Sequence, residues 1–427
     1  MPGARPRRKT GRAFVVAGAA GCLVGLVGGG FRWCLEHADR LRASIVEAAA
    51  GLGVVGWLVP VVLCAVGAAV ACLIAQRVPH AAGSGIQHVE AVWRQESGPY
   101  SLWLLPAKFV GGLIAIGSGL VLGREGPIVH MGAAIGSVAG RRSRLDAEDA
   151  RLLHTALGGA GLAAAFTAPL GGLLFVCEEV TRTIRPRLVL LTLVGTVTAV
   201  VCSRLLVGGA PAFPVPGVPA PPAWTLPVFL LFGVAAGALG AAYSALVVRT
   251  LEACDRTRVP LTVRAAAIGA VVGALMAVDP LLTGGGDPLS RRLLAGDGMT
   301  VVALVAFLAI RFVAGPLSYA AATPGGLFAP LLALGALWGT LAHALASPLL
   351  PAHASGPAAW AVVGMAALFT GVVRAPLTGV VLVVEMTGAA VLMVPLLTAC
   401  FAATVTADWL VSEPLYDSLR RRILERP

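Results

Sequence analysis

Charged residues are scarce in this chain. They make up only 12% of its 427 residues, whereas a soluble domain usually carries about 25%. This shortage argues against an ordinary water-soluble enzyme or binding domain. The eight cysteines include no C-x-x-C pair, and the seven histidines include no H-E-x-x-H motif. We therefore read the cysteines as small apolar residues and expect no metal site, no cofactor and no enzyme activity.

The chain is rich in apolar residues, and its mean hydropathy is +0.86. Several runs have no charged residue over the roughly 17–25 residues needed to cross a bilayer. These runs are 13–31, 54–75, 226–248 and 389–407. Others are shorter, or are broken by glycine, proline or one charge: 109–122, 156–177, 188–203, 300–346 and 359–384. The sequence thus predicts an all-α membrane protein with tilted and interrupted helices.

The formal charge of +11 does not point to nucleic acid, because the basic residues gather at the ends of the apolar runs. This distribution follows the positive-inside rule and predicts that both termini are cytoplasmic. The basic leader is followed by an apolar run without a clear cleavage site, so we expect a first membrane helix there. The expected location is the cell (inner) membrane. The clusters are Arg5, Arg7, Arg8 and Lys9; Arg141, Arg142 and Arg144; Arg182, Arg185 and Arg187; and Arg420, Arg421 and Arg422.

Two patterns occur twice and in the same order. Pro127 is followed by glycines five and nine residues later, and so is Pro330. Ala168-Pro169-Leu170-Gly171-Gly172 leads to Glu178, and Ala375-Pro376-Leu377-Thr378-Gly379 leads to Glu385, ten residues from Ala to Glu in both cases. We therefore predict two diverged membrane repeats, a pattern typical of transporters. The boundaries are a leader 1–11, repeats 12–206 and 225–411, a proline-rich connector 207–224 and a cytoplasmic tail 412–427.

Three glycine-rich turns interrupt the apolar sequence, at 83–86 (GSGI), 123–127 (GREGP) and 325–330 (GGLFAP). In the last two, a proline stands where a helix would begin, a position that suits its missing N–H. The first turn of a helix leaves backbone N–H groups unpaired, which is costly in a membrane unless an acceptor is present. An anion at these helix starts would meet that need. A simple corner between helices is the alternative reading of each turn.

Such a site favours transport over tight capture, because partial charges can replace a halide's hydration shell and still release the ion. Ser84 would supply a hydroxyl, and the amides of Leu327 and Phe328 would lie beside it. A full lysine or arginine charge in the site would hold the ion too tightly.

Glu125 is the residue that the sequence singles out most sharply, because an acid deep in an apolar region is costly and usually functional. We expect its carboxylate to occupy an anion position when ionised and to swing out when protonated. Anion passage and proton movement would then share one side chain. The alternative is a structural ion pair with Arg124 or Lys108.

Two further positions carry open alternatives. Glu178 and Glu179 are adjacent, so they cannot share one helix face. We favour a helix-end salt bridge with an arginine for Glu178, while proton relay and salt bridge are equally open for Glu179. Tyr416 follows the last apolar run and is read either as an interfacial anchor or as a hydroxyl donor to an anion.

Together these motifs resemble the CLC family of chloride channels and chloride/proton antiporters, over residues 12 to 422. The resemblance implies two inverted repeats, a homodimer with one pore per subunit, and chloride and protons as the transported ions. It implies Glu125 as the gating glutamate and Glu179 as the internal proton relay, with recurrent polar positions at Glu90, Lys108 and Arg124. The implied chloride-binding residues are Ser84, Gly85, Ile86, Arg124, Gly126, Leu327, Phe328 and Tyr416.

The chain departs from the family pattern at two positions. Gln87 stands where the first motif often has proline, and Thr167 replaces a common asparagine. Ser84 matches chloride-selecting members, and the first motif differs from that of fluoride exporters. The chain ends soon after Arg422, so we expect no cytoplasmic regulatory domains.

The function predicted is chloride/proton antiport. A passive chloride channel and an intramembrane enzyme using Glu125 or His130 remain as alternatives.

Overall fold

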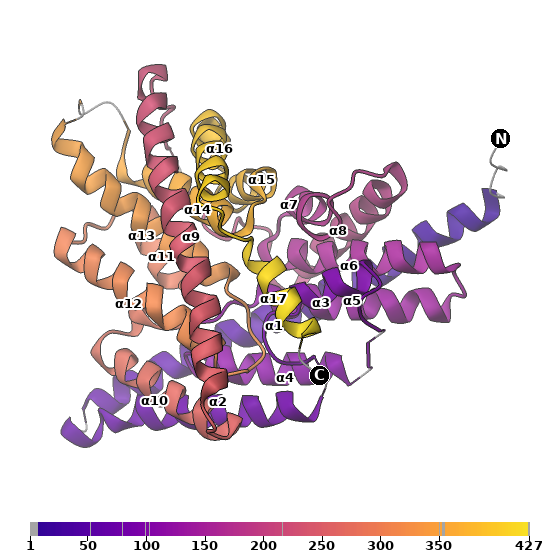
Figure 1. Ribbon diagram of the computed structural model, residues 1–427, viewed down its shortest axis with the longest axis horizontal. Helices are drawn as coiled ribbons and strands as arrows, with labels where there is room; N and C mark the ends of the chain where they lie inside the picture. The colour runs from indigo at the N-terminus through magenta and orange to yellow at the C-terminus, as the bar shows by residue number, and fades with distance from the viewer. Residues whose placement is uncertain are drawn as a thin grey trace.

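The computed structural model describes residues 7–51, 53–78, 80–98, 100–101, 103–215, 217–349, 351 and 355–425. The predicted leader, residues 1–11, lies partly outside these residues. The described part is built almost entirely from α-helices (Figure 1). Its α-helices are α1 (Arg7–Ala50), α2 (Leu58–Arg77), α3 (Ile86–Trp93), α4 (Leu104–Gly117), α5 (Glu125–Arg142), α6 (Ala147–Phe166), α7 (Pro169–Phe175), α8 (Pro186–Val207), α9 (Leu226–Arg256), α10 (Leu261–Val278), α11 (Asp287–Leu294), α12 (Val301–Tyr319), α13 (Phe328–Ala346), α14 (Pro357–Val373), α15 (Pro376–Thr387), α16 (Met393–Trp409) and α17 (Leu415–Leu424).

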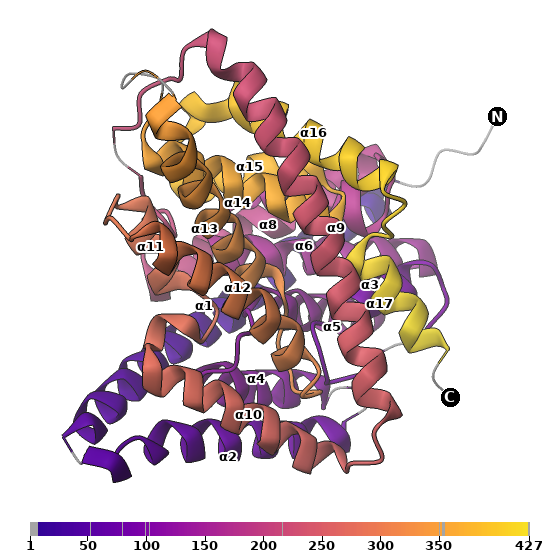
Figure 2. The same ribbon diagram turned by 60° about the vertical axis from the view of Figure 1, so that its left-hand side comes forward.

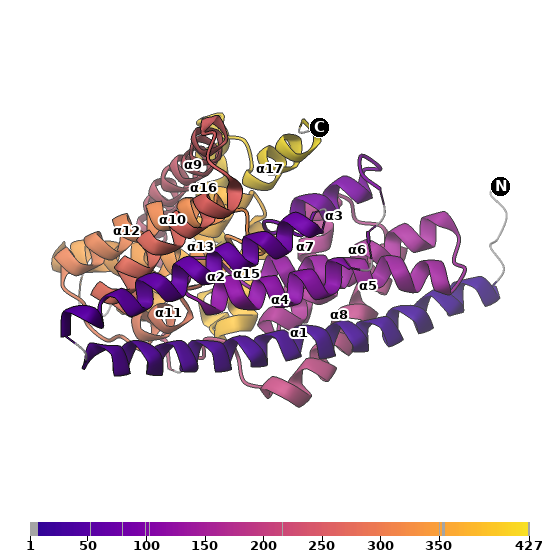
Figure 3. The ribbon, with the colours of Figure 1, turned by 90° about the horizontal axis from the view of Figure 1, so that it is seen from below.

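Within the described residues, eight helical segments are long and apolar enough to cross a membrane. Helix α1 is far longer than the run at 13–31 predicted, because it continues through a charged stretch to Ala50. Figure 3 shows it along the whole length of the molecule. Helix α10 was not predicted from the sequence, because its apolar run contains Arg264 near its start. The run at 300–346 divides into α12 and α13, and the break between them carries the third glycine-rich turn.

Small residues bring the helices close together. A Cβ on Gly25 of α1 would lie 2.2 Å from the carbonyl oxygen of Ala199 in α8, and one on Gly335 of α13 would lie 2.4 Å from that of Gly364 in α14. A side chain at either position would therefore force the helices apart. In a bilayer, where apolar burial gives little driving force between helices, such close contact is a main source of stability.

The two repeats reuse the same local geometry. Helix α6 ends at Thr167 and helix α14 at Arg374, and these residues have φ of 60° and 69°, in the left-handed region. Each is followed by an extended alanine and then by a proline that begins the next helix, α7 or α15. The asparagine common at position 167 in the family fits this conformation better than threonine does. Arg32 donates a hydrogen bond to the Thr167 hydroxyl at 3.0 Å, which ties the turn to α1.

Helices α7 and α15 cap each other. The Glu178 carboxylate follows α7 and accepts hydrogen bonds from the amides of Leu377 (3.0 Å) and Thr378 (2.6 Å), at the start of α15. In return, the Glu385 carboxylate at the end of α15 accepts from the amides of Leu170 (3.1 Å) and Gly171 (2.7 Å), at the start of α7. The start of each helix thus meets the end of the other.

The equivalent segments of the two repeats are therefore antiparallel, as inverted repeats require. The predicted salt bridge between Glu178 and an arginine is wrong: a helix N-terminus, with its unpaired N–H groups, takes the carboxylate instead. The repeat boundaries at 12–206 and 225–411 stay a prediction.

We predict that Glu178→Gln lowers the free energy of unfolding by about 1–2 kcal/mol, because one charged acceptor at the start of α15 is lost. Thermal unfolding in detergent would measure the change. Glu47→Gln, an exposed site on α1, is the matched control and should leave stability unchanged. Equal stability of the Glu178 variant and the control would contradict the capping role.

Candidate functional site

The three glycine-rich turns of the sequence come together through backbone hydrogen bonds. The amide of Gly83 donates to the carbonyl of Thr323 at 2.9 Å, and the amide of Gly325 donates back to the carbonyl of Gly83 at 3.1 Å. Gly123 and Gly326 exchange two more such bonds, at 2.6 and 2.9 Å. The third turn is thus paired with the first and with the second. The pairing places the starts of α3, α5 and α13 around one point.

The buried ammonium of Lys108 holds the first turn from the side. It donates to the carbonyl oxygens of Gly83 at 2.6 Å and of Ser84 at 3.2 Å. These bonds satisfy a charge that lies entirely out of solvent. Lys108 therefore binds carbonyls of the turn, and no ion pair between it and Glu125 is found among the described residues.

The hydroxyl of Ser84 lies where these turns meet. It is buried and its oxygen has no hydrogen-bond partner in the described residues. A Cβ on Gly126 would lie 2.2 Å from this oxygen, so only glycine fits there. Next to Ser84, Gly85 has φ of 92°, a conformation that favours glycine, and Ile86 is the first residue of α3. A buried hydroxyl without an acceptor, at a helix start, is the feature expected of an anion site.

Glu125 is the first residue of α5 and is completely buried. One carboxylate oxygen accepts a hydrogen bond at 3.3 Å from the amide of Ala329, in the first turn of α13. The other oxygen has no hydrogen-bond partner among the described residues, and the nearest cation, Nε of Arg124, is 4.0 Å away. The carboxylate thus lies at a helix N-terminus of the kind that binds anions.

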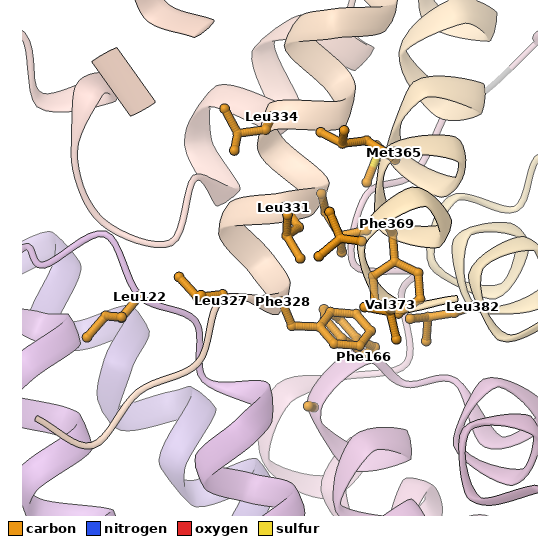
Figure 4. Packing of buried hydrophobic residues seen from close by; sticks show 14 of the residues in the cluster. Leu122, Phe166, Leu327, Phe328, Leu331, Leu334, Met365, Phe369, Val373 and Leu382 are labelled. Carbon is orange, nitrogen blue, oxygen red and sulfur yellow. The ribbon is translucent and has the colours of Figure 1, made fainter. Parts of the chain in front are cut away.

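Phe328 begins α13, directly after Leu327, and both are buried. The Phe328 ring packs against Phe369 of α14, with ring centroids 4.4 Å apart, and against Phe166 of α6 at 5.4 Å. Figure 4 shows these three rings together at the start of α13. Because the anchoring rings come from both repeats, the amide end of α13 is fixed relative to both.

Tyr416 lies in the first turn of α17 and is 1% exposed. Its hydroxyl has no hydrogen-bond partner in the described chain. A fully buried tyrosine is not an interfacial anchor, so the structure rejects that reading of Tyr416. The reading of its hydroxyl as a donor to an anion stays a prediction.

The adjacent acids Glu178 and Glu179 face different surroundings. They lie in a single π-helical turn, Val176–Val180, at the end of α7. Glu178 turns outward to cap α15, whereas Glu179 is 1% exposed and one of its oxygens has no hydrogen-bond partner within the described residues. π-Turns are frequent at functional sites. The salt bridge considered for Glu179 is not found among the described residues.

Comparisons with known proteins agree with this geometry. The sequence profile of the voltage-gated chloride channel family matches residues 66–408. This chain belongs to that family. It is 36% identical to the H(+)/Cl(-) exchange transporter ClcA of Vibrio parahaemolyticus, over 96% of this chain and 90% of the relative. It is 35% identical to the protein of the same name from Salmonella agona, over 98% of this chain and 90% of the relative.

Solved structures give the same fold. A slow cyanobacterial Cl-/H+ antiporter superposes with a TM-score of 0.90 at 28% identity, covering 99% of both chains. A eukaryotic CLC transporter superposes with a TM-score of 0.80 at 23% identity, covering 96% of this chain and 74% of the other. The family consists of ion-transport proteins and not of enzymes. The inverted-repeat CLC architecture predicted from the sequence is confirmed.

Three functional contacts in this family member were missed from the sequence. Arg124, predicted to bind the anion, forms an ion pair with Asp287 at 2.7 Å, and both residues line a cleft whose lining also includes Glu125. The Tyr319 hydroxyl accepts hydrogen bonds from the Ser84 amide at 3.3 Å and from Gln87 at 3.2 Å. Asp287 follows three glycines and precedes a proline at the start of α11, a signal in the sequence comparable to the other glycine-rich turns. Tyr319 stands in no such turn, so only the folded chain identifies it.

His130, named in the enzyme alternative, is buried and bonded to His88, with 3.0 Å between Nε2 and Nδ1. Its ring packs against Gly85. No cluster of three metal-binding side chains is found in the described residues. His130 is therefore placed as a packing and hydrogen-bonding partner of the first turn.

Gln87 stands in the first turn where the family often has proline. Its side chain donates a hydrogen bond to the buried Tyr319 hydroxyl, and this bond takes the place of the rigid proline ring in fixing the turn. We predict that Tyr319→Phe weakens chloride binding by about tenfold, because a buried N–H that loses its acceptor costs about 1–3 kcal/mol. Isothermal titration with chloride would measure the affinity.

Tyr243→Phe provides the control for this variant. The Tyr243 hydroxyl is also buried but has no hydrogen-bond partner in the described residues, so its removal should leave chloride affinity unchanged. Similar affinities for the two phenylalanine variants would show that Tyr319 does not support the turn.

Proposed function

We propose that this protein exchanges chloride for protons across the membrane, with Glu125 as the gating acid. The observation that carries the proposal is the position of the Glu125 carboxylate, bonded to the Ala329 amide at a helix N-terminus. That amide is the kind of donor that would bind a chloride ion. The carboxylate and the anion therefore compete for one set of N–H groups, and protonation of Glu125 removes the competitor.

The anion site in this proposal is formed by the two buried hydroxyls of Ser84 and Tyr416 and by the amides of Leu327 and Phe328. Both hydroxyls lack a partner in the described residues, so each has a donor left for an anion. Gly85, Ile86 and Gly126 shape the backbone around the ion. Arg124 supports the site from its ion pair with Asp287. No full positive charge then touches the ion directly, which allows its release.

Glu179 is the second acid of the proposal. It is buried, unlike Glu178, which caps the start of α15. A proton taken up at Glu179 would reach Glu125 past the anion site. The names of the relatives, H(+)/Cl(-) exchange transporters and a Cl-/H+ antiporter, support exchange over a passive channel.

We also propose that the protein is a homodimer with one pore per subunit in the bacterial inner membrane, and that both termini are cytoplasmic. The orientation rests on the basic clusters at the ends of the apolar runs.

We predict that Glu125→Gln abolishes proton flux driven by a chloride gradient in liposomes and makes chloride flux independent of pH. The amide resembles the protonated acid and cannot exchange a proton. Paired chloride and proton flux measurements would show the change. A variant that keeps the wild-type pH dependence would overturn the gating role of Glu125.

We predict that Glu179→Gln lowers proton flux to background while chloride still passes, because the substitution interrupts the proton pathway at a position outside the anion site. The matched control is Glu178→Gln, one residue away, which should keep proton coupling despite its lower stability. Wild-type chloride transport without any coupled proton flux would instead support a passive channel.

A further inference from the structure

The last helix, α17, carries an ion-pair network directly after Tyr416. Asp417 and Arg420 lie three residues apart on α17 and pair at 3.3 Å. Figure 2 shows α17 beside α3, the helix that contains Glu90. One short helix thus brings a charged cluster next to the hydroxyl of the proposed anion site. Neither Asp417 nor Arg420 has a role in the proposal above.

Asp417 gathers arginines from three parts of the chain. Its carboxylate lies 2.5 Å from Arg182, 3.3 Å from Arg420 and 3.8 Å from Arg94. Arg420 is further held by Glu96 at 2.6 Å. The Asp417 side chain is 13% exposed, so it stands between the solvent and the interior.

Two buried acids lie just inside this cluster. Glu90 is 1% exposed, and neither of its oxygens has a hydrogen-bond partner in the described residues. Its closest cation is Arg420, with 3.7 Å between Nε and the carboxylate, too far for a hydrogen bond. Glu179 is equally buried. Both acids are near arginines that are engaged elsewhere.

The charged groups that surround Glu179 and Glu90 belong largely to the same cluster. Those acting most strongly on Glu179 are Glu90, Arg182, Asp417 and Glu178, and those acting on Glu90 are Asp417, Arg182, Arg420 and Arg94. Glu178 is turned away to cap α15. The one arginine named for Glu179 and the three named for Glu90 all contact Asp417.

An arginine that binds a carboxylate stabilises the ionised form of the acid, whereas a buried carboxylate without such a partner accepts a proton more readily. We propose that Asp417 is a positioning residue for proton uptake, which engages Arg182 and Arg420 so that neither forms a hydrogen bond with Glu179 or Glu90 and these acids can be protonated. This inference rests on the proposed antiport through Glu179. It gives α17 two tasks: Tyr416 faces the anion, and Asp417 sets the charge at the proton entry.

The test is Asp417→Asn, reconstituted in liposomes, with chloride-driven proton flux recorded over a series of symmetrical pH values. Without Asp417, Arg182 and Arg420 are free to pair with the inner acids and hold them ionised. Protonation then requires a lower pH, so the midpoint of the proton-flux profile should move about one pH unit lower, the size expected for a newly paired carboxylate. A merely structural role would lower total activity without moving the midpoint.

Two further variants sharpen the test. Arg182→Gln combined with Asp417→Asn removes a released cation and should return the midpoint toward the wild-type value. Glu413→Gln is the matched control, because Glu413 lies just before the same helix and binds Arg421 and Ser418 of it, away from Asp417. It should leave the profile unchanged.

An Asp417→Asn midpoint equal to that of the wild type, or a double variant that stays shifted, would overturn the positioning role. Glu179→Gln measured in parallel separates this failure from that of the proposed function. If Glu179→Gln abolishes coupling while Asp417→Asn has no effect on the midpoint, only the role of Asp417 is wrong. If Glu179→Gln remains coupled, the relay through Glu179 and this inference both fail.

Discussion

The pairing of the glycine-rich turns is the constraint on which the rest of the site depends. Four backbone hydrogen bonds join residues 323–326 to the turns at 83–86 and 123–127. They bring together three helix starts, whose N–H groups need an acceptor in a membrane. The glycines are required because Ser84 lies so close to Gly126 that a Cβ there would clash with its hydroxyl. The site is therefore a product of main-chain geometry, and side chains complete it.

Competition for helix N-termini recurs through the molecule. Glu178 and Glu385 cap α15 and α7, and Glu125 accepts from the first turn of α13. The caps lie between equivalent helices and hold the two repeats together. Glu125 differs because it is completely buried and one of its carboxylate oxygens has no hydrogen-bond partner in the described residues. The same interaction thus stabilises the fold at one place and, in our proposal, gates the anion at another.

Much of the fold could be predicted from the sequence, because the repeated Pro-Gly-Gly and Ala-Pro…Glu spacings report helix starts and close helix contacts. The glycine-rich turns and Glu125 could be identified because such residues are unusual in apolar sequence. The partners of Arg124 and Ser84 could not be assigned, since Asp287 and Tyr319 are distant from them in sequence. The glycine-rich turn that contains Asp287 was a signal of a further helix start, but it does not reveal which residue it meets. The salt bridge predicted for Glu178 was wrong because its closeness to Arg182 in the sequence does not reveal that the start of α15 faces it in the fold. The length of α1 was underestimated because its charged half leaves the apolar pattern.

The central claim is that the Glu125 carboxylate and a chloride ion compete for the start of α13. Anomalous diffraction from bromide-soaked crystals of the wild type and of Glu125→Gln tests it most directly. We expect a bromide peak beside Ser84, Tyr416 and the amides of Leu327 and Phe328 in both proteins, and an additional peak near the Ala329 amide only in the variant. Absence of a peak beside Ser84, or identical peaks in the two proteins, would contradict the account.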